Sequence, residues 1–199
     1  MAVKNTGASA LKFVKPDNIV ITLYSGASDE TDNDPKGDTY ILDDVVRDTT
    51  SIAQDDNDTT DIERETSDTP ILSIVTAGKY QLAAEVADTQ ADLLVDVCDF
   101  IKDDNDNKVY APQGYKVKYA KVAVVAGTTA VILPKVQLNS KVTMESLNTN
   151  IGKIALAGTA QLASIKIKVK KSGGEGFDDK TIKTPYYIDP AYTLPTVSA

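Results

Sequence analysis

The chain has 199 residues, a formal net charge of -8 and 42% hydrophobic residues, which is enough apolar material for the core of one domain. It contains no His, which excludes Ser-His and Cys-His catalysis and most zinc and haem sites. Its acidity argues against a conventional nucleic-acid binder, which needs a basic surface to displace counterions.

The N-terminal part predicts an arm followed by a β domain. Residues 1–18 hold few large apolar side chains, so we expect an arm that is ordered only where it docks. The β domain is expected over residues 19–171, beginning with a β-branched strand at 19–24. Residues 25–38 are dense in turn formers and predict a loop, and residues 39–46 predict a second strand.

A long acidic loop is predicted over residues 47–69. Residues 48–68 carry eight acids against one base, Arg64, and their only large apolar residues are Ile52 and Ile62. This stretch therefore cannot belong to a hydrophobic core. Polar loops beyond about 12–15 residues are uncommon unless they are functional or disordered, so the loop is the first candidate for a contact with another molecule.

The middle of the chain predicts a tight hairpin and then one helix. Strands at 70–75 and 79–86 flank Thr76-Ala77-Gly78, and the second strand leads into a helix expected over residues 88–102. A 3/4 spacing places four apolar residues on one face of this helix, namely Leu93, Leu94, Val97 and Ile101. Cys98 lies beside this face, and we expect it to be a small buried hydrophobe rather than a reactive thiol.

The second half predicts strands again. They are expected at 115–125, 130–138, 141–147, 153–157 and 162–169. Pro134 predicts an edge, a bulge or a break in the second of them. In the last strand three apolar residues alternate with Lys166, Lys168 and Lys170, which gives one apolar and one basic face. Residues 172–199 are rich in proline and tyrosine and predict a C-terminal arm over another surface.

These elements predict a mainly β fold. Eight to ten short strands with one inserted helix indicate an antiparallel β-sandwich or barrel with one flanking α-helix and extended loop and terminal arms. No apolar run approaches the roughly 20 residues needed to cross a bilayer, so we expect no membrane association.

Neither an enzymatic centre nor a cofactor is expected. The stretches that start at Asp55 and Asp103 place oxygen ligands at alternate positions, but neither has the Gly and Glu that an EF-hand loop requires. Acids are too abundant in this chain for their presence to indicate a catalytic pair. A calcium-binding β-sandwich adhesion module stays open as one alternative.

The charges are distributed as if copies of the chain bind one another. Residues 29–68 carry 15 acids and 3 bases, a local charge of -12, and the remainder carries +4. Such self-complementarity favours head-to-tail contacts, which build rings or filaments. The candidate contact residues are Ile52, Asp55, Asp56, Asp58, Asp61, Ile62, Arg64, Lys166, Lys168, Lys170, Tyr186 and Tyr187.

Residues 10–190 resemble the tail tube proteins of long-tailed bacteriophages, a family related in fold to the inner-tube proteins of contractile injection systems. The resemblance lies in the long polar loop 47–69 and in the hairpin and helix sequence ILSIVTAGKYQLAAEVADTQADLLVDVCDFI. The sequences AVILPKVQL and GKIALAGTAQ and a terminal strand with its arm complete it. The chain departs from the family at the helix end, where Lys102 and Asp103 stand in place of a glycine.

The resemblance implies a structural protein of the virion tail, assembled in the host cytoplasm. Six copies would form a ring, and stacked rings would form a tube whose acidic lumen conducts genomic DNA without binding it specifically. The implied partners are further copies of the chain and the tape measure and tail terminator proteins. A capsid decoration or head–tail joining protein is the first alternative.

Overall fold

The computed structural model describes residues 15–26, 34–64, 67–87, 90–103, 105–106, 108–111, 117–144, 152–171 and 176–196, with backbone only over 63–72. Within these ranges the fold is mainly β, with antiparallel sheets and one α-helix, α2 (Ala91–Cys98), so the predicted fold class is confirmed. The strands are β1 (Asn18–Leu23), β2 (Thr39–Leu42), β3 (Ser51–Gln54), β4 (Asp58–Arg64), β5 (Ser67–Thr76), β6 (Tyr80–Val86), β7 (Ile101–Lys102), β8 (Val109–Tyr110), β9 (Lys118–Ala126), β10 (Thr129–Leu138), β11 (Lys141–Thr143), β12 (Lys153–Ala160), β13 (Ala163–Lys170), β14 (Phe177–Thr184) and β15 (Tyr187–Asp189).

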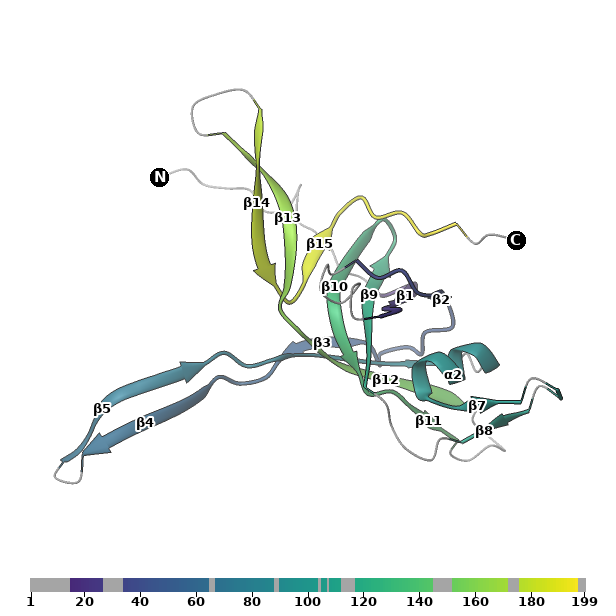
Figure 1. Ribbon diagram of the computed structural model, residues 1–199, viewed down its shortest axis with the longest axis horizontal. Coiled ribbons are helices and arrows are strands. Elements are labelled where there is room, and N and C mark those ends of the chain that lie inside the picture. The colour runs from purple at the N-terminus through teal and green to yellow at the C-terminus, as the bar shows by residue number, and fades with distance from the viewer. Residues whose placement is uncertain are drawn as a thin grey trace.

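One large sheet forms the body of the protein. Its strand order is β2-β1-β9-β10-β12-β6-β3, with β11 added to β12 and β15 added to β10. The remaining strands form three two-stranded pairs, β4/β5, β7/β8 and β13/β14. Figure 1 shows that β4/β5 and β13/β14 project from the body in different directions.

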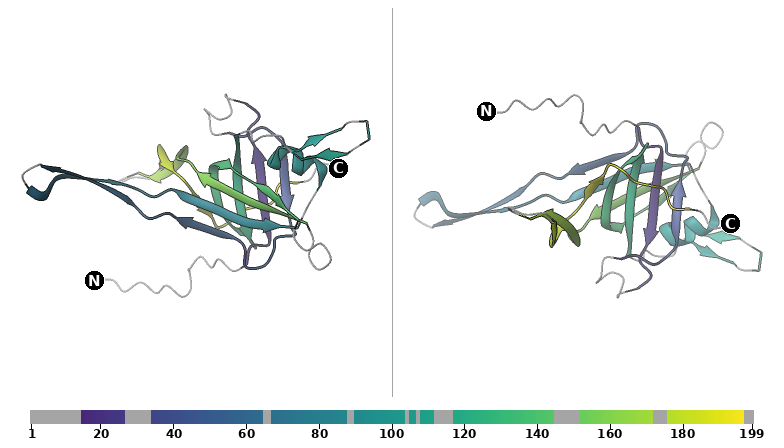
Figure 2. Two further views of the ribbon diagram at one scale, coloured as in Figure 1. Left: turned by 90° about the horizontal axis from the view of Figure 1, so that it is seen from below. Right: turned by 90° about the horizontal axis from the view of Figure 1, so that it is seen from above.

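Pro134 bends β10 and divides the large sheet into two parts. The register between β9 and β10 shifts between Leu133 and Val136, so of the edge, bulge or break predicted at Pro134 the structure has a bulge. Before the bulge β10 pairs with β15, and after it β10 pairs with β12. As a result β12 and β6 cross over the β1 and β9 strands in Figure 2, which gives the sheet its sandwich-like shape.

The main core lies between the two parts of this sheet. Its fully buried side chains come from strands on both sides of the bulge, and α2 adds Leu93, Leu94, Val97 and Cys98. A smaller cluster around Val20 and Ile132 lies on the other face of the sheet, where Tyr187 and Tyr192 pack against it. Burial raises the pKa of both tyrosines. Within the predicted C-terminal arm, residues 187–192 therefore pack on the protein's own sheet, whereas residues 177–184 form β14.

The helix is shorter than the predicted span of 88–102. It ends at Cys98 because Asp99 takes a left-handed conformation with φ of 62°. Ile101 then belongs to β7 and is 55% exposed, so its predicted place on the buried helix face is wrong. The other three predicted face residues are buried.

The predicted hairpin between 70–75 and 79–86 is also wrong. The strand β5 pairs with β4, whereas β6 pairs with β3 and β12. The predicted loop 47–69 instead contributes β3 and β4. In a two-stranded pair the inward-facing backbone groups bond to each other and the outward-facing ones bond to water, so no side chain has to be buried. An acidic stretch with β-branched Thr59, Thr60 and Ile62 can therefore be extended in water.

Candidate interaction surfaces

The first candidate surface is the acidic ribbon, defined here as β4 and β5. The two strands pair from Asp58↔Thr76 to Arg64↔Ser67, and they lie far from the body of the protein in Figure 1. Among the described strands, β4 and β5 pair only with each other. Isolated two-stranded ribbons are marginally stable in water, so a partner that covers a face of the ribbon would stabilise it.

The acidic ribbon continues the pairing of β3 with β6. At the junction the Asp55 amide donates to the Lys79 carbonyl at 2.8 Å, and the Gly78 amide donates to Asn57 Oδ1 at 3.1 Å. Gln81 Nε2 donates to Asp55 Oδ2 at 2.9 Å. These three bonds bridge the gap between the β3/β6 pair and the β4/β5 pair, so they help to set the ribbon's direction.

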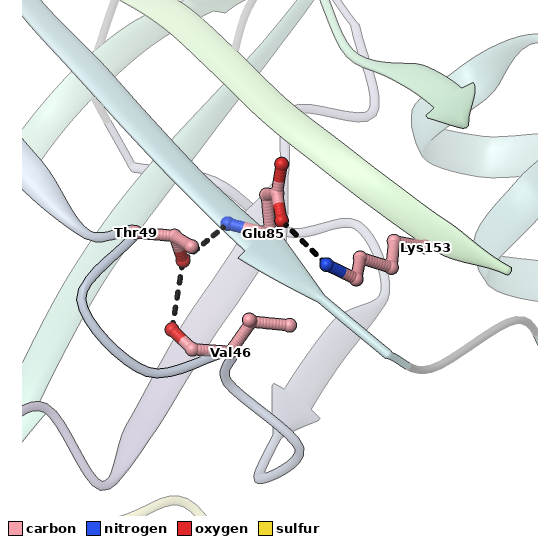
Figure 3. Close-up of polar contacts among 4 residues, drawn as sticks. All are labelled: Val46, Thr49, Glu85 and Lys153. Carbon is pink, nitrogen blue, oxygen red and sulfur yellow. Dashed lines mark hydrogen bonds and ion pairs between the residues drawn. The ribbon is translucent and has the colours of Figure 1, made fainter. Parts of the chain in front are cut away.

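The chain that enters β3 is fixed by side-chain contacts as well. Figure 3 shows Thr49 donating its hydroxyl hydrogen bond to the Val46 carbonyl at 2.8 Å and accepting one from the Glu85 amide at 3.0 Å. The Glu85 carboxylate also forms an ion pair with Lys153 of β12 at 3.0 Å. These contacts hold the end of β3 that lies away from the ribbon on β6, and the ion pair joins β6 to β12.

The two faces of the acidic ribbon differ in polarity. Residues directly opposite in an antiparallel pair share a face, so Ile62 and the Thr60↔Ile74 pair lie on one side. Ile62 is 45% exposed and Ile74 is 46% exposed, which is unusual for side chains of this size. Asp58 lies on this side too, and the other side carries the 60% exposed Val75 together with Asp61, whose carboxylate accepts a hydrogen bond from Ser73.

The second candidate surface is the basic ribbon, defined here as β13 and β14. Lys166, Lys168 and Lys170 are exposed on one face, opposite Thr181, Asp179 and Phe177 respectively. The predicted alternation is confirmed at Ile165 and Ile167, which are half-buried between these lysines, whereas Val169 is 40% exposed. The sequence 163–184 carries six lysines against three acids.

The third surface is an apolar groove of about 900 Å³ at the roots of both ribbons. Gly78 and Tyr80 line it from the acidic ribbon's side, and Leu162 and Tyr186 line it from the basic ribbon's side. The rings of Tyr80 and Tyr186 pack at 5.1 Å between centroids with a tilt of 58°. Ile188, which is 40% exposed, completes the apolar lining.

The structure separates the predicted contact residues into several groups. Asp55, Asp56, Asp58, Asp61 and Ile62 lie on the acidic ribbon or its junction, and the three lysines lie on the basic ribbon. Tyr186 lines the groove and also packs against the main core, as Ile52 does, and Tyr187 packs against the smaller cluster. Arg64 ends β4 opposite Ser67, and its side chain lies outside the described part.

Sequence reasoning missed the groove and its two exposed apolar residues, Leu162 and Ile188. They belong to segments that carry no motif and meet only in the fold. The one available signal was Leu162 itself, a large apolar residue between β12 and β13 with no place in the alternating pattern.

Among the described residues, no group of three or more His, Cys, Asp or Glu side chains is placed to hold a metal ion. Burial raises the pKa of Cys98 to about 11, and the nearby Asp99 adds to this effect more weakly than Lys118 opposes it. No helix in the described ranges is long and apolar enough to span a membrane.

Comparison with known proteins gives no match to a family model, to a curated protein or to a solved structure.

Proposed function

We propose that this chain is a structural protein that assembles with copies of itself, as the subunit of a bacteriophage tail tube. The observation that carries the proposal is a pair of oppositely charged β-ribbons projecting from one β domain. Projecting ribbons of this kind offer contact surface at a distance from the body, where a neighbouring copy can reach it.

Charge complementarity supports a contact between the two kinds of ribbon. The sequence 55–79 carries seven acids and two bases, a local charge of -5, while the sequence 163–184 carries +3. Because the ribbons of one chain point in different directions, they do not pair within the chain. Pairing between copies is a heterologous contact, which repeats to form a ring or a filament.

The resemblance to tail tube proteins suggests which assembly these contacts build. Six copies form a ring, rings stack into a tube, and DNA passes through an acidic lumen without specific binding. The tape measure and tail terminator proteins are the expected further partners. In this arrangement the acidic ribbon contacts the next ring, since it extends farthest from the body.

Electron microscopy of the purified protein in negative stain tests the proposal. Tubes or six-fold rings support a tail tube subunit. Monomers or trimers at every concentration support a capsid decoration or head–tail joining protein instead. Thermal melting in the presence and absence of calcium is measured in parallel, and a calcium-dependent rise in melting temperature supports an adhesion module.

A further inference from the structure

The groove at the roots of the two ribbons leaves apolar side chains uncovered by the described part of the chain. Leu162 is 68% exposed and Ile188 is 40% exposed, and both border a hollow of about 900 Å³. Tyr80 and Tyr186 form its half-buried wall. An apolar hollow of this size at a projecting root is typical of a docking site.

The acidic ribbon carries the matching apolar face. Ile62 and Ile74 lie on the same side of the ribbon, and each is nearly half exposed. Ile74 is six residues from Tyr80 in an extended chain, which places it about 20 Å along the ribbon from the groove of its own molecule. The ribbon therefore cannot cover the groove of the chain to which it belongs.

We propose that the groove of one copy receives the apolar face of the acidic ribbon of a second copy. Ile62 and Ile74 of the incoming ribbon pack against Leu162 and Ile188, with Tyr186 at the wall. This inference rests on the proposed self-assembly and specifies which surfaces meet.

Charge complementarity identifies a second copy as the occupant. Leu162 directly precedes the basic strand β13, and Thr184, which also lines the groove, ends β14. Lys166 follows Leu162 by four residues, so a ribbon that is seated in the groove and continues along β13 lies beside the exposed lysines of the basic ribbon. Asp58 lies on the same face of the ribbon as Ile62 and Ile74, so its carboxylate meets those lysines. The acidic ribbon of a second copy thus matches both the apolar lining of the groove and the positive charge beside it.

Cysteine cross-linking between two variants tests this contact. Both are made in full-length protein with the buried Cys98 replaced by alanine, so that each chain has one thiol. Ile62→Cys marks the apolar face of the ribbon, and Leu162→Cys marks the groove. Thr59→Cys is the matched control, because Thr59 is exposed on the opposite face of the same ribbon. The variants are mixed in pairs, oxidised gently and separated without reductant.

The expected result is that Ile62→Cys forms a disulfide with Leu162→Cys at least about ten times faster than Thr59→Cys does. Equal or slower cross-linking than the control overturns the groove contact, whether or not particles form. Electron microscopy of the same mixtures before oxidation distinguishes the two failures. Tubes or rings without the preferred cross-link leave the self-assembly proposal in place, whereas the absence of particles contradicts both.

Discussion

Gly78 lies directly against the backbone of Asp55. A Cβ atom at position 78 would be 1.8 Å from the Asp55 carbonyl oxygen and 2.8 Å from that of Asp56. The acidic ribbon joins the large sheet at this crossing, where the two chain segments approach more closely than any side chain allows. The ribbon can therefore leave the sheet in this direction only if residue 78 is glycine.

Replacing Gly78 with alanine should loosen the junction. The added Cβ would clash with backbone atoms, which cannot move aside as the end of a flexible side chain can. The two segments must therefore separate and lose the Gly78–Asn57 hydrogen bond. We expect a loss of about 1–3 kcal/mol in unfolding free energy and faster amide exchange throughout β4 and β5. Gly26→Ala is the control, because nothing lies within 4 Å of its added Cβ. Unchanged exchange in the Gly78→Ala ribbon would contradict the close approach.

Lys118 should stabilise the end of α2. Its ammonium group lies 2.7 Å from the Val95 carbonyl oxygen and 3.1 Å from Asp99 Oδ1, and both side chains of the ion pair are largely buried. Lys118→Met removes the donor, so we expect a loss of about 1–3 kcal/mol in chemical denaturation. Lys141→Met, at an exposed position of β11, should change stability by less than about 0.5 kcal/mol. Equal effects of the two substitutions would rule out this role for Lys118.

Cys98 should make stability fall with rising pH above about 9. Burial raises the pKa of its thiol from 9.0 to about 11 in the folded state. Between these values the unfolded chain releases the proton while the folded chain retains it, so the contribution is complete below pH 9 and is lost as pH approaches 11. We expect wild type to lose about 2–3 kcal/mol more than Cys98→Ala between pH 8 and 11. The alanine variant carries the same tyrosines and lysines, and parallel stability curves would exclude this effect.

The structural features that depend on residues close together in the chain could be predicted from the sequence. The irregularity at Pro134 and the buried face of Leu93, Leu94 and Val97 both follow from residues close together in the chain. The acidic ribbon could not be recognised, because an exposed ribbon and a polar loop share the same composition. The helix end was missed because a left-handed aspartate, Asp99, stands where glycine is usual.

The groove could not be predicted from the sequence. Its residues come from β3, the β5–β6 connection, β10, β12 and the segment around Tyr186, so no short stretch contains its pattern. Its position depends on where β12 leaves the sheet at Gln161 to enter the basic ribbon. That departure is set by tertiary pairing of β10 with both β12 and β15.

Shortening the acidic ribbon should prevent assembly without unfolding the subunit. Residues 58–76 are replaced by an Asn-Gly turn, which preserves β3 and its pairing with β6. Few described side chains of the ribbon are buried, so we expect the unfolding free energy to change by about 1 kcal/mol or less. Sedimentation should show a folded subunit that forms no particles. Particles of normal length from this variant would remove the ribbon from the assembly contact.

Double charge reversal tests most directly whether the two ribbons join copies of the chain. One set of substitutions makes the acidic ribbon basic (Asp56→Lys, Asp58→Lys and Asp61→Lys), and the other makes the basic ribbon acidic (Lys166→Glu, Lys168→Glu and Lys170→Glu). Each set alone should raise the protein concentration needed for assembly at least about tenfold, because like charges then meet. The chain that carries both sets should assemble again, as should a mixture of the two singly reversed proteins. Assembly that is unaffected by either set, or that is not restored when the two are combined, would contradict a contact between the ribbons.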